Sequence, residues 1–245
     1  MWIIFYIEGK KDNKLKRKER KQMEKNKNSM TYKGYKPNGK MLAAFAVVLL
    51  LAAAFITYEV VCVYDTQPLP LDLQIQSFFF SLRGDIQNIP ICAMTHLTDT
   101  VSVVGYCVIL LILPSRKKYG VPLTAASIAG VAIYKPLKHI ALRARPDKAL
   151  HLVEQGGYSF PSGHSVTSVL FYGLAIYLLH RHCKNEKLRK IMTAVCAFLF
   201  VFTGPSRIYV GVHWPTDVLA GWCVGGAVLI FSILVLEKIY EKRLR

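Results

Sequence analysis

The chain combines a hydrophobic content of 53% with a formal net charge of +17 over 245 residues. Its Lys and Arg residues stand in blocks between long apolar runs, a pattern that is typical of an integral membrane protein and argues against a soluble nucleic-acid-binding protein. The six cysteines form no Cys-x-x-Cys pair, so they indicate neither a zinc site nor a disulfide framework.

The first segment, residues 1–40, is a polar tail that holds 13 of the 32 Lys and Arg residues. A charge run of this kind is typical of a solvated, disordered segment that fixes the orientation of the chain, so no nucleic-acid partner is expected. One codon choice for Lys18-Glu19 would resemble a bacterial ribosome-binding site, and we therefore hypothesise that translation starts at Met23.

Long apolar runs follow the tail and define the main domain, residues 41–240. A helix that crosses about 30 Å of hydrocarbon needs roughly 20 mostly apolar residues. Six runs predict an all-α, six-helix membrane bundle: residues 41–64, 90–114, 121–140, 165–179, 191–203 and 216–236. The fifth run is short unless residues 204–212 continue it. Residues 241–245 form the C-terminal end.

Between the first two runs, apolar residues recur at helical spacing among polar ones: Leu71, Ile75, Phe78, Phe79 and Leu82. This spacing predicts a short amphipathic helix that lies in the membrane interface. A buried re-entrant segment is the alternative.

The basic loops predict the orientation of the bundle. Of the 32 Lys and Arg residues, 25 lie on the side of the two termini, in the tail, residues 115–120, residues 180–190 and residues 237–245. The positive-inside rule then places both termini in the cytoplasm. The ends of the third and fifth spans, and the starts of the fourth and sixth, face the extracytoplasmic side.

Three polar fragments flank those four span ends, and we expect them to form one site: Lys138 with Arg145-Pro146, Pro161-Ser162-Gly163-His164, and Ser206-Arg207 with His213 and Asp217. The three cations Lys138, Arg145 and Arg207 suit the oxygens of a transferring phosphoryl group. Any one of them alone could merely snorkel to the lipid headgroups. Lys135, Arg143 and Lys148 are assigned to that category.

The second fragment precedes the fourth span. Gly163 lets backbone approach a ligand, the start of a helix offers free N–H groups to an anion, and Ser162 adds a hydroxyl donor. His164 stands where an imidazole can protonate a leaving alkoxide.

The third fragment pairs His213 with Asp217 four residues later. A carboxylate on one ring nitrogen orients a histidine whose other nitrogen attacks, whereas the structural alternative is that Asp217 caps the sixth helix and His213 snorkels. Three cations would repel a divalent ion, and no His-Glu-x-x-His pattern occurs, so we expect neither a metal nor a cofactor.

Together the three fragments resemble the three-part signature of the type 2 phosphatidic acid phosphatase superfamily, over residues 41–240. The resemblance implies a six-helix membrane core and metal-independent dephosphorylation. It implies that His213 attacks phosphorus, Asp217 orients it and His164 protonates the leaving oxygen. It also implies that the phosphate oxygens are held by Lys138, Arg145, Ser162, Gly163 and Arg207.

These patterns predict a lipid phosphatase of a bacterial plasma membrane with its site on the extracytoplasmic side. Phosphatidylglycerophosphate or phosphatidate is the first substrate expected, and undecaprenyl pyrophosphate is the alternative. A non-enzymatic protein that binds or transports lipid phosphates is the alternative of another class, although binding alone would not need an oriented nucleophile.

Overall fold

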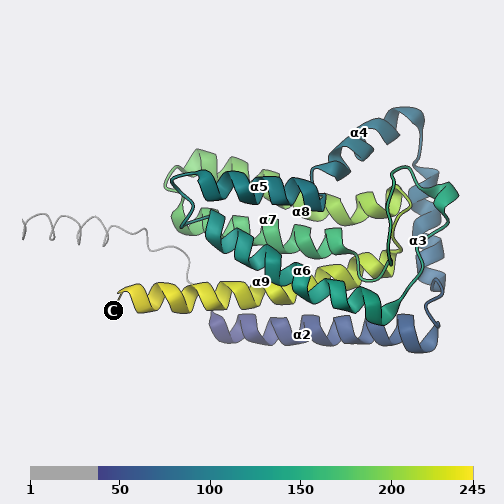
Figure 1. Ribbon diagram of the computed structural model, residues 1–245, viewed down its shortest axis with the longest axis horizontal. Coiled ribbons are helices and arrows are strands. Elements are labelled where there is room, and N and C mark those ends of the chain that lie inside the picture. Colours follow the sequence, from purple (N-terminus) through teal and green to yellow (C-terminus); the bar gives the residue numbers. More distant parts are fainter. Residues whose placement is uncertain (1–37, 245) are drawn as a thin grey trace, which may run out of the picture.

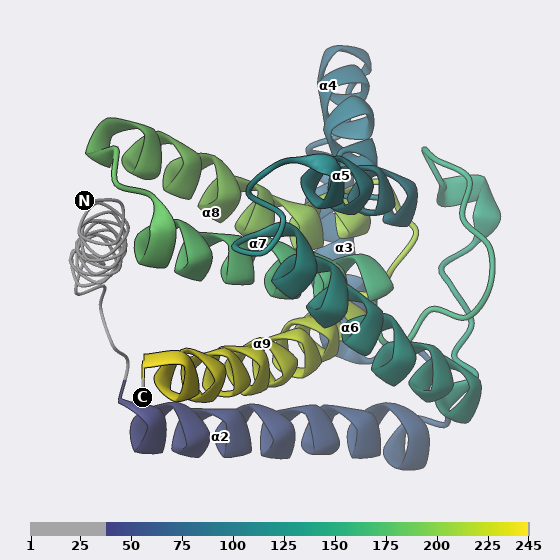
Figure 2. The same ribbon diagram turned by 60° about the vertical axis from the view of Figure 1, so that its left-hand side comes forward.

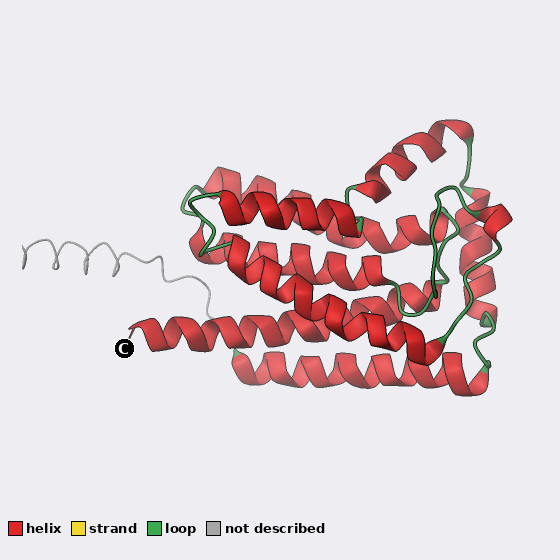
Figure 3. Ribbon diagram, in the orientation of Figure 1, coloured by secondary structure: helices red, strands yellow, loops and turns green. Residues whose placement is uncertain are grey.

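The computed structural model describes residues 38–244, and in that part of the chain all regular structure is helical (Figure 3). The predicted tail, except its last three residues, and the Met23 start lie outside the described residues. The helices are α2 (Gly39–Tyr58) with the π-helical turn η1 (Glu59–Val63), α3 (Pro70–Ser81), α4 (Asp85–His96), α5 (Thr100–Ile112), α6 (Gly120–Ala141), the short η2 (Lys148–Leu150), α7 (Gly163–His182), α8 (Glu186–Tyr209) and α9 (Pro215–Leu244).

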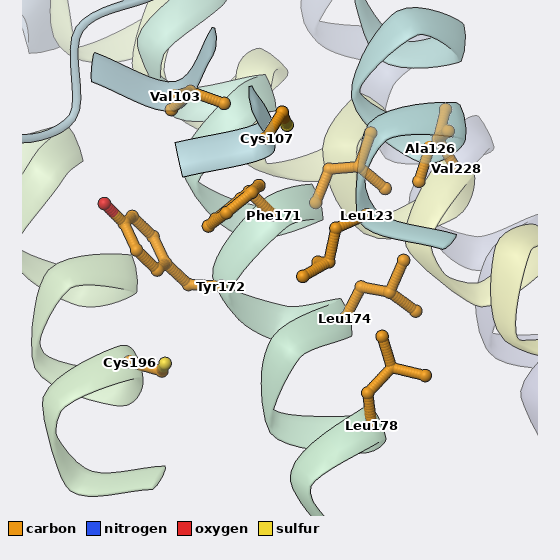
Figure 4. Close-up of a cluster of buried hydrophobic side chains, with 11 residues drawn as sticks. Val103, Cys107, Leu123, Ala126, Phe171, Tyr172, Leu174, Leu178, Cys196 and Val228 are labelled. Atoms are coloured by element: carbon orange, nitrogen blue, oxygen red, sulfur yellow. The ribbon is translucent and has the colours of Figure 1, made fainter. Parts of the chain in front are cut away.

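Helix α7 is the centre of the bundle. It packs against α6, α8 and α9, while α2 lies along α9 at the edge (Figures 1 and 2). It contributes Leu170, Leu174 and Leu178 to the largest core cluster. Leu123 of α6 and Val228 of α9 belong to the same cluster, to which α5 and α8 also contribute (Figure 4). All five side chains are less than a tenth exposed, so hydrophobic burial holds α7 in place.

Two glycines of α9 allow a close approach to α7. A Cβ atom on Gly221 would lie 2.7 Å from the carbonyl oxygen of Ser162, and one on Gly225 would lie 2.7 Å from that of Val166. Any larger residue would therefore push the two helices apart. The start of α7 and the start of α9 are brought together by this contact.

Within residues 38–244, three single helical segments pass a test of length and mean hydropathy for crossing a membrane, fewer than the six expected spans. They are Gly39–Val63, Glu186–Tyr209 and Pro215–Lys242. The fifth span thus continues beyond Thr203, as its length required. Helices α6 and α7 occupy the positions of the third and fourth spans, but the test does not select them. The count of six spans therefore stays a prediction.

The second expected span, residues 90–114, is not one straight helix. Helices α4 and α5 meet at residues 97–99 with a bend of 46°. The pair passes the same test only when its two helices are taken together. This break lies beside the polar residues described below, where it places Asp99 outside a regular helix.

The helix expected between the first two spans is present as α3, but its faces are arranged in an unexpected way. Its polar residues Asp72 and Gln76 are buried, whereas Leu71, Leu73 and Phe78 are exposed. The polar side of α3 therefore faces the protein, and its apolar side faces outward. A position in the membrane interface stays a prediction for this helix.

Candidate active site

The three polar fragments meet at one end of the bundle. Lys138 lies near the end of α6, Ser162 to His164 open α7, Arg207 lies near the end of α8, and Asp217 lies in the first turn of α9. Arg145 and His213 lie in the connecting loops. This end of the bundle is opposite the start of α2 and the end of α9 (Figure 1).

His213 occupies the most enclosed position of the site, with 1% of its surface exposed. Its Nδ1 lies 3.4 Å from Oδ2 of Asp217 and 3.3 Å from Oγ of Ser159, while its Nε2 lies 3.1 Å from Nη1 of Arg145. An arginine can only donate, so this contact favours the tautomer that carries its proton on Nδ1. Nε2 then carries the electron pair, which accepts from Arg145 in this structure.

The charge state of His213 fits the same arrangement. Burial, together with the nearby cations Arg145 and Lys138, lowers the pKa of His213 well below its ordinary value of 6.5. The imidazole is therefore neutral at physiological pH, which is the state that a nucleophile requires.

Asp217 contacts both His213 and the local backbone. Its Oδ2 accepts the backbone N–H of Trp214 at 2.9 Å and a hydrogen bond from the hydroxyl of Ser159. Its Oδ1 accepts from Nη1 of Arg143 at 2.7 Å. One carboxylate thus makes the contact expected of a cap and the contact expected of an orienting group, and the orienting role stays a prediction.

The assignment of Arg143 as a snorkelling residue was wrong. Its side chain is fully buried, and its Nη2 lies 2.6 Å from Oδ2 of Asp72 on α3. Asp72 in turn accepts the backbone N–H of Thr216 at 2.8 Å. Asp72, Arg143 and Asp217 form a buried ion chain that fastens α3 to the start of α9, and we call it the Asp72–Arg143–Asp217 chain. Such charges are tolerated inside a protein only when they are paired.

Two cations beside His213, Arg145 and Lys138, donate to backbone carbonyl oxygens of the loop before α7. Arg145 donates to the carbonyl oxygens of Gly156 at 3.0 Å and Gly157 at 2.9 Å. Burial lowers the pKa of Arg145 to about 10, which still leaves it positive at neutral pH. Lys138 donates to the carbonyl oxygen of Tyr158 at 2.7 Å. The loop therefore fixes both cations in place.

Arg207 supplies the third cation and is 1% exposed. Its Nη1 lies 3.1 Å from the hydroxyl of Thr95 and 3.8 Å from Oδ1 of Asp99, and its Nη2 donates to Oε1 of Gln155 at 2.6 Å. Its Nε has no hydrogen-bond partner among residues 38–244. A buried donor of this kind is available to an oxygen of a ligand.

His164 stands across the site from His213, with 6.4 Å between the ring centroids. Its Nε2 lies 2.7 Å from Oδ1 of Asp99, the last residue of the break between α4 and α5. Ser162 is the N-cap of α7 and accepts from the backbone N–H of Ser165 at 3.3 Å. A Cβ atom on Gly163 would lie 2.8 Å from the ring of Tyr134, so packing alone already requires glycine there.

The structure thus brings all eight predicted residues to one end of the bundle. Sequence reasoning missed the side chains that support them: Asp72, Thr95, Asp99, Arg143, Gln155 and Ser159. No group of three His, Cys, Asp or Glu side chains that could share a metal ion occurs within residues 38–244. Independence of the reaction from metal stays a prediction.

The fold and this arrangement define a class: a helical membrane protein in which two histidines and three cations lie together at one end of the bundle. Residues 119–241 match the model of the PAP2 superfamily, and the chain belongs to that superfamily. The resemblance to type 2 phosphatidic acid phosphatases is therefore confirmed.

Curated relatives carry two different substrate names. The chain is 39% identical over 101 residues to phosphatidylglycerophosphatase B of Bacillus subtilis (strain 168), which covers 41% of this chain and 48% of that protein. It is 30% identical over 132 residues to an undecaprenyl-diphosphatase of Sulfolobus acidocaldarius, which covers 52% of this chain and 60% of that protein. The matched regions therefore span only about half of the length of these two relatives.

Solved structures extend the similarity to most of the chain. The crystal structure of a transmembrane PAP2-type phosphatidylglycerolphosphate phosphatase from Bacillus subtilis superposes with a TM-score of 0.69 at 26% identity, over 79% of this chain and 96% of that one. LpxE from Aquifex aeolicus shares the fold, with a TM-score of 0.56 at 24% identity, over 68% of this chain and 96% of that one.

Proposed function

We propose that this protein is a metal-independent lipid phosphatase that hydrolyses a phosphomonoester or pyrophosphate headgroup through a phosphohistidine on His213. The observation that carries this proposal is the surroundings of His213. Its ring is buried and neutral, Asp217 and Ser159 hold Nδ1, and Nε2 points to a cation. A histidine that only bound a headgroup would gain nothing from an orienting carboxylate.

The reaction runs in two displacements. In the first, Nε2 of His213 attacks phosphorus, the bond to the leaving oxygen breaks, and His164 gives that oxygen a proton. In the second, water attacks phosphorus and passes a proton to His164, and the phosphorus–nitrogen bond breaks. Phosphate leaves, and both histidines return to their starting states.

The cations stabilise the charge of the phosphoryl group through both displacements. Lys138, Arg145 and Arg207 surround the reacting nitrogen and supply fixed positive charge. Ser162 and Gly163 add the donors at the start of α7 to this set. Since Arg145 already lies beside Nε2 of His213, an entering phosphate oxygen meets its guanidinium first.

An apolar groove supports a lipid over a soluble phosphate ester. The groove lies between α5 and α6 and has a volume of about 620 Å³. It begins at Thr100, next to Asp99, and at Thr167, one helical turn after His164. Val104, Val108 and Ile128 line its length. A lipid tail in this groove would place its headgroup at the site.

Two lipid classes fit this arrangement. Phosphatidylglycerophosphate or phosphatidate is our first candidate, in keeping with the name of the Bacillus subtilis relatives. Undecaprenyl pyrophosphate is the second, and it is favoured by our inference from the basic residues that the site lies on the outer face of the plasma membrane. The start of α2 and the end of α9 lie at the end of the bundle opposite the site (Figure 1), which supports an even number of spans, in keeping with our proposal of six spans and cytoplasmic termini.

The test is phosphate release by the purified protein from phosphatidylglycerophosphate, phosphatidate and undecaprenyl pyrophosphate, in matched detergent and with EDTA present. We expect turnover of at least one lipid that EDTA does not reduce. Absence of phosphate release from all three, with or without EDTA, would favour the non-enzymatic binding or transport protein. The ratio of the three rates decides between the two lipid classes.

A further inference from the structure

Asp99 holds an N-cap position but does not serve as a cap. It precedes Thr100, the first residue of α5, and its side chain makes no hydrogen bond to the helix backbone. Aspartate at such a position ordinarily accepts a backbone N–H of the first turn. Here both carboxylate oxygens are used elsewhere: Oδ1 lies 2.7 Å from Nε2 of His164, and Oδ2 lies 2.7 Å from Nδ1 of His96.

The charges around His164 explain what a carboxylate can do there. Burial of the ring is the largest cause that disfavours the protonated form of His164, followed by the nearby cations Arg207 of α8 and Arg145 of the preceding loop. His213 of the α8–α9 loop faces the same ring and disfavours that form when it is itself charged. Asp99 faces the same ring and favours that form. A general acid must hold its proton until the leaving oxygen takes it.

A role in binding phosphate does not account for Asp99. Its carboxylate lies 3.8 Å from Nη1 of Arg207, close to where a phosphate oxygen would bind, and two anions repel each other there. Its position is understandable if the carboxylate acts on His164 instead. His96, with 61% of its side chain exposed, holds the second oxygen of Asp99 and so restricts its rotation.

We propose that Asp99 is the positioning residue of the acid, as Asp217 is of the nucleophile. This inference rests on the proposed phosphatase function. Asp99 accepts the Nε2–H of His164, which leaves Nδ1–H as the proton that passes to the leaving oxygen. The neutral imidazole keeps its Nε2–H bond to Asp99, and its Nδ1 then takes the proton of the attacking water.

The test compares two leaving groups. The alkoxide of phosphatidate must be protonated as it leaves, whereas the p-nitrophenolate of p-nitrophenyl phosphate leaves without a proton. We expect Asp99→Asn to lower kcat for phosphatidate by about 10²-fold, in the range of a general-acid contribution, and to change the rate of the first p-nitrophenolate burst, which precedes water attack, by less than about threefold. His164→Ala should lose the phosphatidate rate more completely and also keep the burst, and Asp99→Glu should restore much of the phosphatidate rate.

The pH profile gives a second readout. Without the carboxylate, His164 loses its proton at lower pH, so the alkaline limb of kcat for phosphatidate should move down by about one pH unit in Asp99→Asn. The matched control is Asp147→Asn, since Asp147 is an exposed carboxylate whose side chain caps the short η2 helix. It should leave both rates and the pH profile unchanged.

Three results would overturn the inference. Equal losses in the phosphatidate rate and in the p-nitrophenolate burst would show that Asp99 only maintains the structure. An unchanged or faster phosphatidate rate would show that its carboxylate merely competes with the substrate for Arg207. An alkaline limb that stays in place would show that the carboxylate does not act on the charge of His164. If the wild-type protein releases no phosphate from either compound or from the other lipids, the proposed function itself fails, and that outcome is separate from these three.

Discussion

The two histidines of the site are held by very different surroundings. His213 and Asp217 are at most 1% exposed, and the Asp72–Arg143–Asp217 chain joins them to α3. The partner of His164 is Asp99, whose side chain is 27% exposed and lies at the break between α4 and α5. A nucleophile gains from a dry, rigid position, whereas a proton donor must exchange its proton with the leaving group and with water. We attribute the difference to these two tasks.

The largest expected effect separates the two histidines. His213→Ala should lower phosphate release from every substrate by about 10⁴-fold or more, because it removes the attacking atom. His164→Ala should abolish lipid turnover but retain the first burst of p-nitrophenolate from p-nitrophenyl phosphate, whereas its steady-state rate falls because water attack lacks its base. Both variants should stay folded, as judged by size-exclusion elution and helical circular dichroism. Loss of the p-nitrophenolate burst in both variants would remove the distinction between the two roles.

The next effect concerns the rigidity of the His213 side. Arg143→Met keeps the length of the side chain but leaves Asp72 and Asp217 as buried, unpaired carboxylates. Breaking a buried ion pair in this way costs about 3–5 kcal/mol, so we expect a clear fall in thermal stability and in activity. Lys148→Met is the matched control, since Lys148 is exposed in the same loop. An unchanged melting temperature in Arg143→Met would show that the chain of charges does not fasten α3 to α9.

A smaller effect is expected where α7 meets α9. Gly221→Ala introduces a Cβ atom 2.7 Å from the carbonyl oxygen of Ser162, and overpacking of this kind costs about 1–3 kcal/mol. The displacement of α7 from α9 that this Cβ atom causes should also move His164 relative to His213 and lower kcat. Gly105→Ala is the control, because no atom lies within 4 Å of its added Cβ and alanine favours a helix. Equal melting temperatures for the two variants would contradict the close packing.

The smallest effect is a dependence of stability on pH. The pKa of His213 is well below 6.5 in the folded protein and about 6.5 in the unfolded chain. Below that pH the unfolded chain binds a proton that the native site excludes, so stability falls as the pH falls, by at most about 1.4 kcal/mol per pH unit from this group. Thermal unfolding between about pH 7.5 and 5 should therefore show a steeper decline for the wild type than for His213→Gln. Parallel declines would mean that His213 is not held neutral.

Sequence patterns predicted the site better than they predicted its supports. The eight signature residues stand at the ends of predicted spans, so their meeting on one face was expected from the predicted alternation of those spans. Arg143 and Asp72 are 71 residues apart, and His164 and Asp99 are 65 apart. Neither pair has a spacing that marks it as a contact. Arg143 also stands two residues from Arg145 in a loop, where exposure is the ordinary expectation for an arginine.

The break in the helix near Asp99 could not be predicted from the sequence either. Residues 90–114 are apolar enough to predict one continuous span, yet the helix breaks at residues 97–99. The break gives Asp99 the freedom to reach His164, and hydropathy carries no information about such a contact. At α3, helical spacing predicted the helix, but spacing does not show which face of a helix is buried, and here the polar face is the buried one.

The central claim is that His213 carries the phosphoryl group during turnover. The most direct test is rapid quenching in alkali, which preserves phosphohistidine, of the protein mixed with ³²P-labelled phosphatidate or p-nitrophenyl phosphate. We predict label on the peptide that contains His213, none in His213→Ala, and accumulation in His164→Ala with the aryl ester, because water attack then lacks its base. Label on a different residue, or turnover of wild-type protein with no labelled enzyme at any time, would contradict the account.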